Sequence, residues 1–427
     1  MKILVLADNF TPEIVAPSFR THEHARVWLE QGHEVTVVTC APNWPHGRVF
    51  EGYRNRLYAE EWIDGIRVIR VWSYMTANKG FLRRTLDYLS YMVSAVLWCW
   101  HYPGFDVILA TSPQFFTAVA GWIISVLRRR PWVFELRDLW PDSIRAVGVS
   151  RGRLIRWLER LELFLYRRAD RVVALTNAFQ RNLVARGIAA EKIDVVTNGV
   201  DLEQFSPAQV RFDARERLGV PAADFLVAYV GTTGIAHGLE TMLQAAQQCA
   251  DQPQIRFLIM GEGAERAWLE TQSRELGLQN LRFSDRVPHD QMPSYLAAIN
   301  LPLIHLRPDP VFKTVIPSKL FEFMAMGRPV LLAVEGECAE IVTAAQCGVC
   351  IPSGRADIMA ATIRQLAQEP ERLAAMGRRG QFAVQAQYSR RVKARAVLES
   401  LRALLPDTGE PVCRPFTENV SAVRKAA

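Results

Sequence analysis

Residues 225–234 read Phe-Leu-Val-Ala-Tyr-Val-Gly-Thr-Thr-Gly. The apolar run Phe225–Val230 predicts a short strand that is buried on both faces. The glycine-bounded loop Gly231–Gly234 follows it, and the residues Leu239–Cys249 then predict a helix. A buried strand that leads through a glycine loop into a helix is the repeating unit of a parallel sheet covered by helices.

The same unit recurs along the chain in both directions. Ile255–Met260 predicts the next strand, followed by the turn Gly261-Glu262-Gly263 and a helix over Ala264–Leu276. Near the start, Lys2–Ala7 predicts a strand and Phe19–Gln31 a helix. Further strands are predicted over Val35–Thr39, Val107–Ala110, Trp132–Leu136, Arg171–Leu175 and Asp194–Val196. We therefore expect an α/β fold of two Rossmann-like, doubly wound domains that face each other across a cleft, with ligands beyond the carboxyl ends of the strands.

The pattern restarts after Val200-Asp201, which divides the chain. We predict an N-terminal domain over residues 1–205 and a C-terminal domain over residues 206–385. A last helix, 386–405, is expected to cross back to the N-terminal domain, and residues 406–427 are expected to form a flexible tail.

Composition limits the choice of partners and compartment. With 427 residues, 49% of them hydrophobic, the chain can bury two cores, and its net charge of +7 fits an anionic ligand or an anionic membrane surface. It carries no signature of a nucleic-acid-binding module, so we expect no nucleic acid partner. The apolar run at Met1–Ala7 is too short for a signal peptide, and Leu86–Trp100 and Phe115–Leu127 are too short to span a bilayer. Seven scattered cysteines suit a reducing cytoplasm, where we expect the protein.

Four loops are of the kind that binds phosphate. They are Asn9–Ser18, Gly231–Gly234, Gly261–Gly263 and Ile316–Glu322. A helix start presents free N–H groups and the positive end of the helix dipole, and glycine lets the backbone approach an anion closely. Glycines after strands also serve plain turns, so each loop alone has a purely structural alternative.

The fourth loop has the clearest chemistry. Ser318, Lys319 and Glu322 fall within one helical turn and share a face. The lysine can neutralise phosphate oxygens, and the carboxylate can accept both hydroxyls of a ribose. A capping serine beside a solvated Lys–Glu pair is the alternative. The apolar neighbours favour the functional interpretation because they bury most of the helix: Leu320, Phe321, Phe323 and Met324.

Several motifs together resemble the family 4 retaining glycosyltransferases, which have the GT-B fold. They are Asn198-Gly-Val-Asp201 with Phe205, Tyr229-Val-Gly231, Gly261-Glu-Gly263 and Lys319–Val330. Other segments resemble one subgroup of bacterial polysaccharide enzymes, the fucosamine-transferase and colanic-acid type. These segments are Ala41–Gly47, Gly52–Asn55, Glu135–Asp142 and Ile316–Glu322. The resemblance covers essentially the whole chain.

The resemblance implies a metal-independent enzyme without a cofactor, since the nucleotide sugar is a substrate. It would transfer a sugar, with retention, from a nucleotide-diphosphate donor to a polyprenol-diphosphate-linked saccharide in the synthesis of O-antigen, capsule or exopolysaccharide. A UDP-sugar is the first expectation for the donor and a GDP-sugar the second. Such an acceptor would place the enzyme on the inner face of the plasma membrane as a peripheral protein.

Site residues follow from the resemblance position by position. The expected catalytic residues are Lys319, Glu322, Arg137 and Asp138. Donor-binding residues would be Gly231, Thr232, Thr233, Gly234, His237, Gly261, Gly263, Val287, Thr314 and Ser318. On the acceptor side, the expected residues are Glu13, Ala16, Pro17, Ser18, His22 and Asn43. No metal ligands are expected.

The sequence also departs from the family pattern. Thr314 stands where the family has a first glutamate, and Thr232 and His237 stand where it has an arginine and a lysine. Ala16-Pro17 replaces a glycine pair, and Arg137-Asp138 replaces a histidine. Lys319 and Arg137 are the candidates for the missing positive charge.

Two segments are candidates for membrane contact. The basic stretch Arg151–Arg168, preceded by Arg128–Arg130, carries apolar residues at helical spacing: Trp157, Leu161, Phe164 and Leu165. The aromatic segment Phe81–Trp100 is the second candidate, and packing onto the sheet explains the apolar stripe of the first equally well.

Two other functions remain open: a nucleotide-sugar epimerase with the same two-domain plan, and an inactive scaffold, which the missing glutamate suggests.

Overall fold

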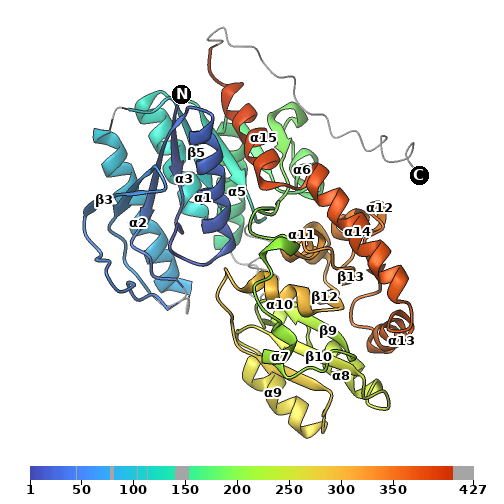
Figure 1. The fold of residues 1–427 in the computed structure, drawn as a ribbon. Coiled ribbons are helices and arrows are strands. Elements are labelled where there is room, and N and C mark those ends of the chain that lie inside the picture. Colours follow the sequence, from blue (N-terminus) through green and yellow to red (C-terminus); the bar gives the residue numbers. More distant parts are fainter. Residues whose placement is uncertain (45, 77–80, 103, 113, 140–152, 407–427) are drawn as a thin grey trace. The chain divides into compact units, whose positions relative to one another are not determined.

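The computed structural model describes residues 1–44, 46–76, 81–102, 104–112, 114–139 and 153–406 (Figure 1). The chain forms two compact units. One comprises Met1–Asn198 with the segment that begins at Arg390, and the other comprises Gly199–Ser389. Trp140, Pro141 and Asp142 of the motif quoted above, Arg151 and the tail from residue 407 lie outside the described residues.

The first unit is built on an eight-stranded sheet of order β3-β4-β2-β1-β5-β6-β7-β8. Every neighbouring pair is parallel except β3 and β4, which are antiparallel. The strands are β1 (Lys2–Leu6), β2 (Glu34–Cys40), β3 (Tyr58–Ile63), β4 (Ile66–Val71), β5 (Val107–Thr111), β6 (Trp132–Leu136), β7 (Arg171–Ala174) and β8 (Ile193–Val195).

Helices alternate with these strands. They are α1 (Ala16–Glu30), α2 (Phe81–His101), α3 (Phe115–Arg128), α5 (Arg153–Arg168), α6 (Asn177–Ala185), the 3₁₀ turn η1 (Ala190–Lys192) and α15 (Arg390–Arg402). The last helix returns to the first unit and packs along α1. The indole N–H of Trp28 donates to the carbonyl of Ala394 at 2.8 Å, which anchors α15 there.

The second unit is built on a six-stranded, all-parallel sheet of order β11-β10-β9-β12-β13-β14. Its strands are β9 (Phe225–Val230), β10 (Ile255–Met260), β11 (Leu281–Ser284), β12 (Leu301–His305), β13 (Val330–Ala333) and β14 (Gly348–Cys350). Its helices are η2 (Pro207–Gln209), α7 (Ala214–Leu218), η3 (Ile235–His237), α8 (Glu240–Gln248), α9 (Arg266–Glu275), α10 (Met292–Ala298), η4 (Pro310–Thr314), α11 (Lys319–Ala325), α12 (Glu337–Ala344), α13 (Ala356–Leu366) and α14 (Pro370–Gln387).

Strand β9 shows why this sheet needs helices on both faces. Alternate side chains of a strand point to opposite faces, and all six of its residues are buried. Leu226, Ala228 and Val230 belong to one hydrophobic cluster. Phe225, Val227 and Tyr229 belong to another. The continuous apolar run in the sequence is therefore the signature of a central parallel strand, as predicted.

Most predicted elements lie within a few residues of the observed ones, and the two doubly wound α/β units are confirmed. The hairpin of β3 and β4 was not predicted. Strand β3 lies at the sheet edge, and its half-exposed sequence has no buried apolar run. Glu60 and Glu61 pair on this hairpin with Arg67 and Arg70.

The first unit ends at Asn198, seven residues before the boundary placed at 205. The reason is packing in the second unit. The amide of Val200 donates to the carbonyl of Tyr388 at 2.9 Å, and Phe205 is buried in the C-terminal core.

No helix within the described part of the chain has both the length and the apolar character needed to cross a bilayer.

Candidate functional site

In the second unit, the loops after β9 and β10 are hydrogen-bonded to each other. The amide of Thr233 donates to the carbonyl of Glu262, and the amide of Glu265 donates to the carbonyl of Thr233, both at 2.9 Å. Because the two strands are adjacent and parallel, their loops meet at the carboxyl edge of the sheet. The loops that were predicted to bind phosphate therefore form one continuous layer.

Two glycines make this layer possible. A Cβ atom on Gly261 would lie 2.0 Å from the carbonyl oxygen of Gly231, and Gly261 also has a φ of +135°. A Cβ atom on Gly263 would lie 2.4 Å from the carbonyl oxygen of Thr233. Close backbone approach thus explains both glycines without a ligand, so the structural alternative accounts for their presence.

The amides of the first loop are partly occupied. Gly231 donates to the carbonyl of Met260 at 3.0 Å, and Thr233 donates to Glu262. The side chain of Thr233 is buried, and its Oγ1 has no hydrogen-bond partner in the described residues, whereas Thr232 is exposed. A phosphate at this loop would therefore depend on other groups for most of its neutralisation.

His237 does not supply that positive charge. Its ring lies against the backbone of Gly234 and edge-on to Tyr229. Burial lowers the pKa of His237 more than the hydrogen bond with Gly234 raises it, so the ring is neutral at neutral pH. The carbonyl of His237 in turn accepts a hydrogen bond from Nδ1 of His305 at 2.6 Å, which joins this loop to the end of β12.

Helix α11 carries the lysine–glutamate pair that the structural alternative predicts. Lys319 Nζ donates to Glu322 Oε2 at 2.7 Å, and the glutamate side chain is only 9% exposed. Ser318, at the helix start, makes no capping hydrogen bond with its side chain. The ion pair of the alternative therefore forms, but the serine does not cap the helix and the glutamate is not solvated.

Two other predicted donor residues make contacts within the second unit. Thr314 donates its hydroxyl to the carbonyl of Val311 at 2.7 Å within η4, and Val287 packs against the C-terminal hydrophobic core. Helix α11 contacts β12 and β13, and β12 pairs with β9. The structure therefore brings α11 and the two loops to neighbouring strands of one sheet.

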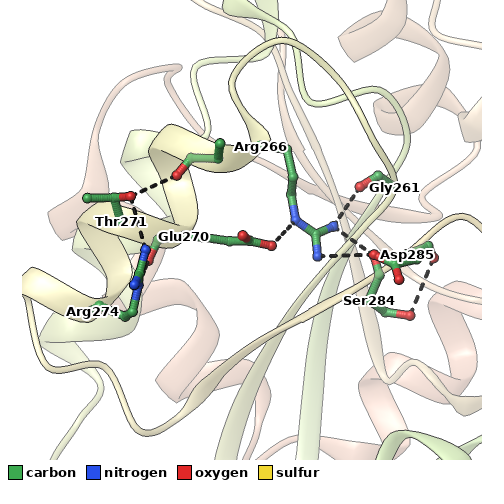
Figure 2. A network of polar contacts seen from close by, with 8 residues as sticks. Gly261, Arg266, Glu270, Thr271, Arg274, Ser284 and Asp285 are labelled. Carbon is green, nitrogen blue, oxygen red and sulfur yellow. Dashed lines mark hydrogen bonds and ion pairs between the residues drawn. The ribbon is translucent and has the colours of Figure 1, made fainter.

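Two arginines that the sequence reasoning missed hold the loops in place. Arg307 follows β12 and lies 3.0 Å from Glu240 and 3.6 Å from Glu265, so it ties three loops together. Arg266 donates to the carbonyls of Gly261 and Ser284 at 2.7 and 2.8 Å, and so bridges the ends of β10 and β11 (Figure 2). Their signal is an arginine or an acid shortly after each strand, which is too common to single out.

In the first unit, the acceptor-side residues separate into different environments. Glu13 is buried, and its carboxylate accepts hydrogen bonds from the amides of Asn43 and Trp44 at 2.8 Å and from the side chain of Asn9 at 3.0 Å. Its oxygens therefore join the loop after β1 to the loop after β2. Ala16 and Pro17 form the first turn of α1.

The other acceptor-side residues lie on α1. His22 contacts Asp64, with Nε2 and Oδ2 2.9 Å apart, and so faces the turn between β3 and β4. Ser18 is buried, and its Oγ has no hydrogen-bond partner in the described residues. His24 is buried as well, and its Nε2 is likewise unpartnered among these residues.

A buried ion pair at the centre of the first unit was also missed. Arg20 donates to Glu135 at 2.8 Å and to the carbonyls of Val196 and Thr197 at 3.3 and 3.1 Å. Burial would raise the pKa of Glu135, but the charges of Arg20 and Arg137 lower it, and the net effect is a lowered pKa. Glu135 is therefore ionised, and Arg20 joins α1 to β6 and to the residues that follow β8.

Arg137 and Asp138, predicted as catalytic, follow β6. The amide of Arg137 donates to Ser112 Oγ at 2.8 Å. Asp138 lies close enough to Tyr166 of α5 to raise the pKa of that phenol, after burial and the nearer Glu162. The catalytic roles of the two residues stay predictions.

Comparisons with known proteins agree with this architecture. Residues 17–199 match the family model for the glycosyl transferase 4-like domain, and residues 210–382 match the model for glycosyl transferases group 1. The chain belongs to the glycosyltransferase family that these two models describe.

One relative and two solved structures show the extent of the similarity. The putative colanic acid biosynthesis glycosyl transferase WcaI of Escherichia coli K12 is 27% identical over 379 residues, which are 86% of this chain and 92% of WcaI. Sucrose-phosphate synthase from Thermosynechococcus elongatus superposes with a TM-score of 0.75 at 19% identity, over 94% of this chain and 98% of that structure. The Anabaena Alr3699/HepE structure in complex with UDP-glucose has a TM-score of 0.70 at 22% identity, over 95% of this chain and 100% of that chain.

The Arg266 bridge gives a stability prediction for this glycosyltransferase. We expect Arg266→Met to lower the free energy of unfolding by about 2 kcal/mol, because it leaves two carbonyls without their charged donor. Arg274→Met on the same helix α9 is the control, since Arg274 lies at the surface beside Thr271 (Figure 2). Chemical denaturation of both variants measures the difference. Equal losses for the two variants would contradict the bridging role.

Proposed function

We propose that this glycosyltransferase transfers a sugar from a nucleotide-diphosphate donor to a lipid-linked saccharide in the synthesis of a bacterial surface polysaccharide. The observation that carries the donor half of this proposal is the Lys319–Glu322 pair on the otherwise buried helix α11. The name of WcaI supports a role in polysaccharide synthesis, and the UDP-glucose complex of Alr3699/HepE supports a UDP-sugar as the first donor to test. A GDP-sugar is the second.

The proposed mechanism follows from where charge develops. Breaking the bond between the anomeric carbon and the diphosphate oxygen leaves growing negative charge on the leaving group. A fixed cation at that oxygen stabilises the transition state more than the ground state. Lys319 is the proposed cation, since His237 is neutral and the amides of Gly231 and Thr233 are occupied.

Glu322 is proposed to accept the ribose hydroxyls of the donor. A buried carboxylate that binds only one partner has lone pairs left for two hydroxyl groups. Thr314 carries no carboxylate, and we propose retention without an enzyme nucleophile at this position and without a bound metal. An epimerase would instead release a changed sugar nucleotide without an acceptor, and a scaffold would release nothing.

Nucleotide binding tests the donor site. We expect wild-type protein to bind one of UDP, GDP and ADP in calorimetric titration, and Lys319→Ala to weaken its Kd about tenfold or more, because a charge-assisted hydrogen bond contributes about 1.5–3 kcal/mol. Glu322→Gln, which keeps the shape of the side chain, should also weaken binding because the amide accepts poorly from two hydroxyls.

Lys313→Ala is the matched control. Lys313 also forms a lysine–glutamate pair, with Glu335 at 2.5 Å, but both side chains are about half exposed. We expect this variant to bind nucleotide like the wild type. If folded wild-type protein binds none of the three nucleotides, the donor site is wrong and the scaffold is favoured. The anomeric configuration of the product, read by NMR, decides between retention and inversion.

Peripheral contact with an anionic membrane is part of the proposal. Helix α2 exposes apolar side chains at positions seven, four and three residues apart, which share one stripe. Together with two exposed residues at the end of α3, they form what we term the apolar face: Leu86, Val93, Leu97, Trp100, Val126 and Leu127. Helices α2 and α3 pack side by side, and Arg128 donates to the carbonyl of Trp100 at 3.2 Å.

Charge at the edges of the apolar face suits anionic lipid. Arg83, Arg84, Arg129 and Arg130 are exposed beside it. By contrast, the stripe predicted on α5 is divided: Leu165 is fully buried and Phe164 packs on Trp122, whereas Trp157 is 55% exposed. The packing interpretation of that helix therefore holds for its inner residues, and α2 is the better candidate for lipid contact.

Vesicle sedimentation tests this surface. We expect Trp100→Ser to reduce binding to vesicles of phosphatidylglycerol and phosphatidylcholine about fivefold to tenfold, because a partly buried indole contributes about 1–1.5 kcal/mol at an interface. Trp268→Ser on α9 is the control, since that tryptophan is also about half exposed but lies in the other unit. Added salt should weaken wild-type binding. Equal effects of the two substitutions would contradict the assignment.

A further inference from the structure

Arg137 is a charged side chain whose hydrogen-bonding groups are not used. Its Nε and Nη1 atoms are buried and have no hydrogen-bond partner among the described residues. It follows β6, and its amide is bound to Ser112 after β5, so it stands at the carboxyl edge of the first sheet. Ligands of open parallel sheets bind at this edge.

Other arginines with buried nitrogen atoms differ from Arg137 in having partners. Arg307 and Arg328 each have an unpartnered Nε, but Arg307 pairs with two glutamates and Arg328 donates to the carbonyl of Ile299 at 3.2 Å. Arg20 uses all three of its nitrogens. Within the described part of the chain, the guanidinium of Arg137 has no hydrogen-bond partner of this kind.

The charges around Arg137 leave a positive surplus. Three guanidinium groups, of Arg20, Arg137 and Arg390, influence one another there, and Glu135 attracts Arg137. Among the described residues, two carboxylates are bound to the other two arginines. Glu135 is bound to Arg20, and Glu23 is bound to Arg390. A buried charge without a counter-ion is strongly destabilising, so the surplus favours an anion supplied by a ligand.

His24 lies in the same electrostatic environment. Burial, and then the charges of Arg20, Arg390 and Arg137, lower its pKa well below the usual value, so the ring is neutral. Its buried, unpartnered Nε2 offers a hydrogen bond without an added charge. Burial also lowers the pKa of Arg137, to about 10, which leaves the guanidinium charged at neutral pH.

We propose that Arg137 binds a phosphate or carboxylate group of the substrate within the N-terminal unit, with the buried His24 in the same group of charges. This inference rests on the proposed glycosyl transfer and narrows its substrate class. The group is either the diphosphate of a lipid carrier or the carboxylate of an acidic sugar. A guanidinium binds either group through paired N–H donors, which a lysine or histidine cannot reproduce.

Titration of the full-length protein with three probes tests the proposal. The probes are farnesyl diphosphate for the carrier, glucuronate for the acidic sugar and UDP for the donor. We expect wild-type protein to bind one of the first two, and Arg137→Leu to weaken that binding at least about tenfold while UDP binding stays unchanged. The probe that responds identifies the source of the anion. Arg26→Leu, an exposed arginine on α1, should bind every probe like the wild type.

The melting temperature of the unliganded protein distinguishes a binding role of Arg137 from a structural role, because the two roles predict opposite changes in the Arg137→Leu variant. Removing a buried charge without a counter-ion should leave the melting temperature of Arg137→Leu equal to or above that of the wild type. A loss of several degrees would make Arg137 a structural residue and overturn the proposal.

The titration has two further outcomes that decide against the inference. Weaker UDP binding by Arg137→Leu would assign this arginine to the donor diphosphate instead. UDP binding without any response to the two anions would sink the inference and leave the proposed function standing. If the wild-type protein bound none of UDP, GDP and ADP, the proposed function would fail, and the two anion titrations would still be read separately.

Discussion

The approach of two backbone segments at the carboxyl edge of the second sheet determines what the rest of the donor site can be. The carbonyl oxygens of Gly231 and Thr233 occupy the space in which a side chain at position 261 or 263 would lie. Once the loops after β9 and β10 are joined in this way, the amides of Gly231, Thr233 and Gly261 donate to backbone carbonyls. A phosphate at this edge then depends largely on side chains, which gives α11 its importance.

The first unit uses charge where the second uses backbone contact. Arg20 lies inside the unit and binds Glu135 and the carbonyls at the end of β8, so one guanidinium fixes α1 across the carboxyl edge of the sheet. Such a pair is costly to desolvate, and it is stable only when every donor is used. That condition is met by Arg20 and not by Arg137, although the two lie in the same field.

The sequence is informative where local pattern and tertiary burial coincide. The run Phe225–Val230 predicts β9 to the residue, because a strand covered on both faces has no polar positions. The hairpin of β3 and β4 escaped prediction because an edge strand alternates exposed and half-buried residues and resembles a loop. Lys319 and Glu322 were found because both fall within a single helical turn.

Long-range partners could not be found in this way. Arg20 and Glu135 are 115 positions apart, and no local spacing connects them. His22 and His24 differ by only two positions on α1, yet one contacts Asp64 at the surface and the other is buried among arginines. Glu13 is an acid near a predicted cleft, but the amides of two residues about thirty positions later occupy its carboxylate. Which polar group stays free depends on the whole packing, and this is the property that distinguishes a binding group from a structural one.

The ion pairs of the second unit place a condition on donor binding. Near its loops, Arg266, Arg307 and Lys319 each have an acidic partner, so the unit has no free cation among these three. On the proposed function, the ribose hydroxyls of the donor bind Glu322, and Lys319 is then free to bind the phosphate. The contact between Lys319 and Glu322 is replaced by two contacts with the donor. Ribose and phosphate recognition would then be coupled through one carboxylate. A ligand that lacks either group would keep less than half of the binding free energy of the complete nucleotide, because the two contributions are not additive. In the absence of the donor, Glu322 would neutralise the charge of Lys319. A largely buried helix can therefore carry a catalytic cation without the cost of an unpaired buried charge.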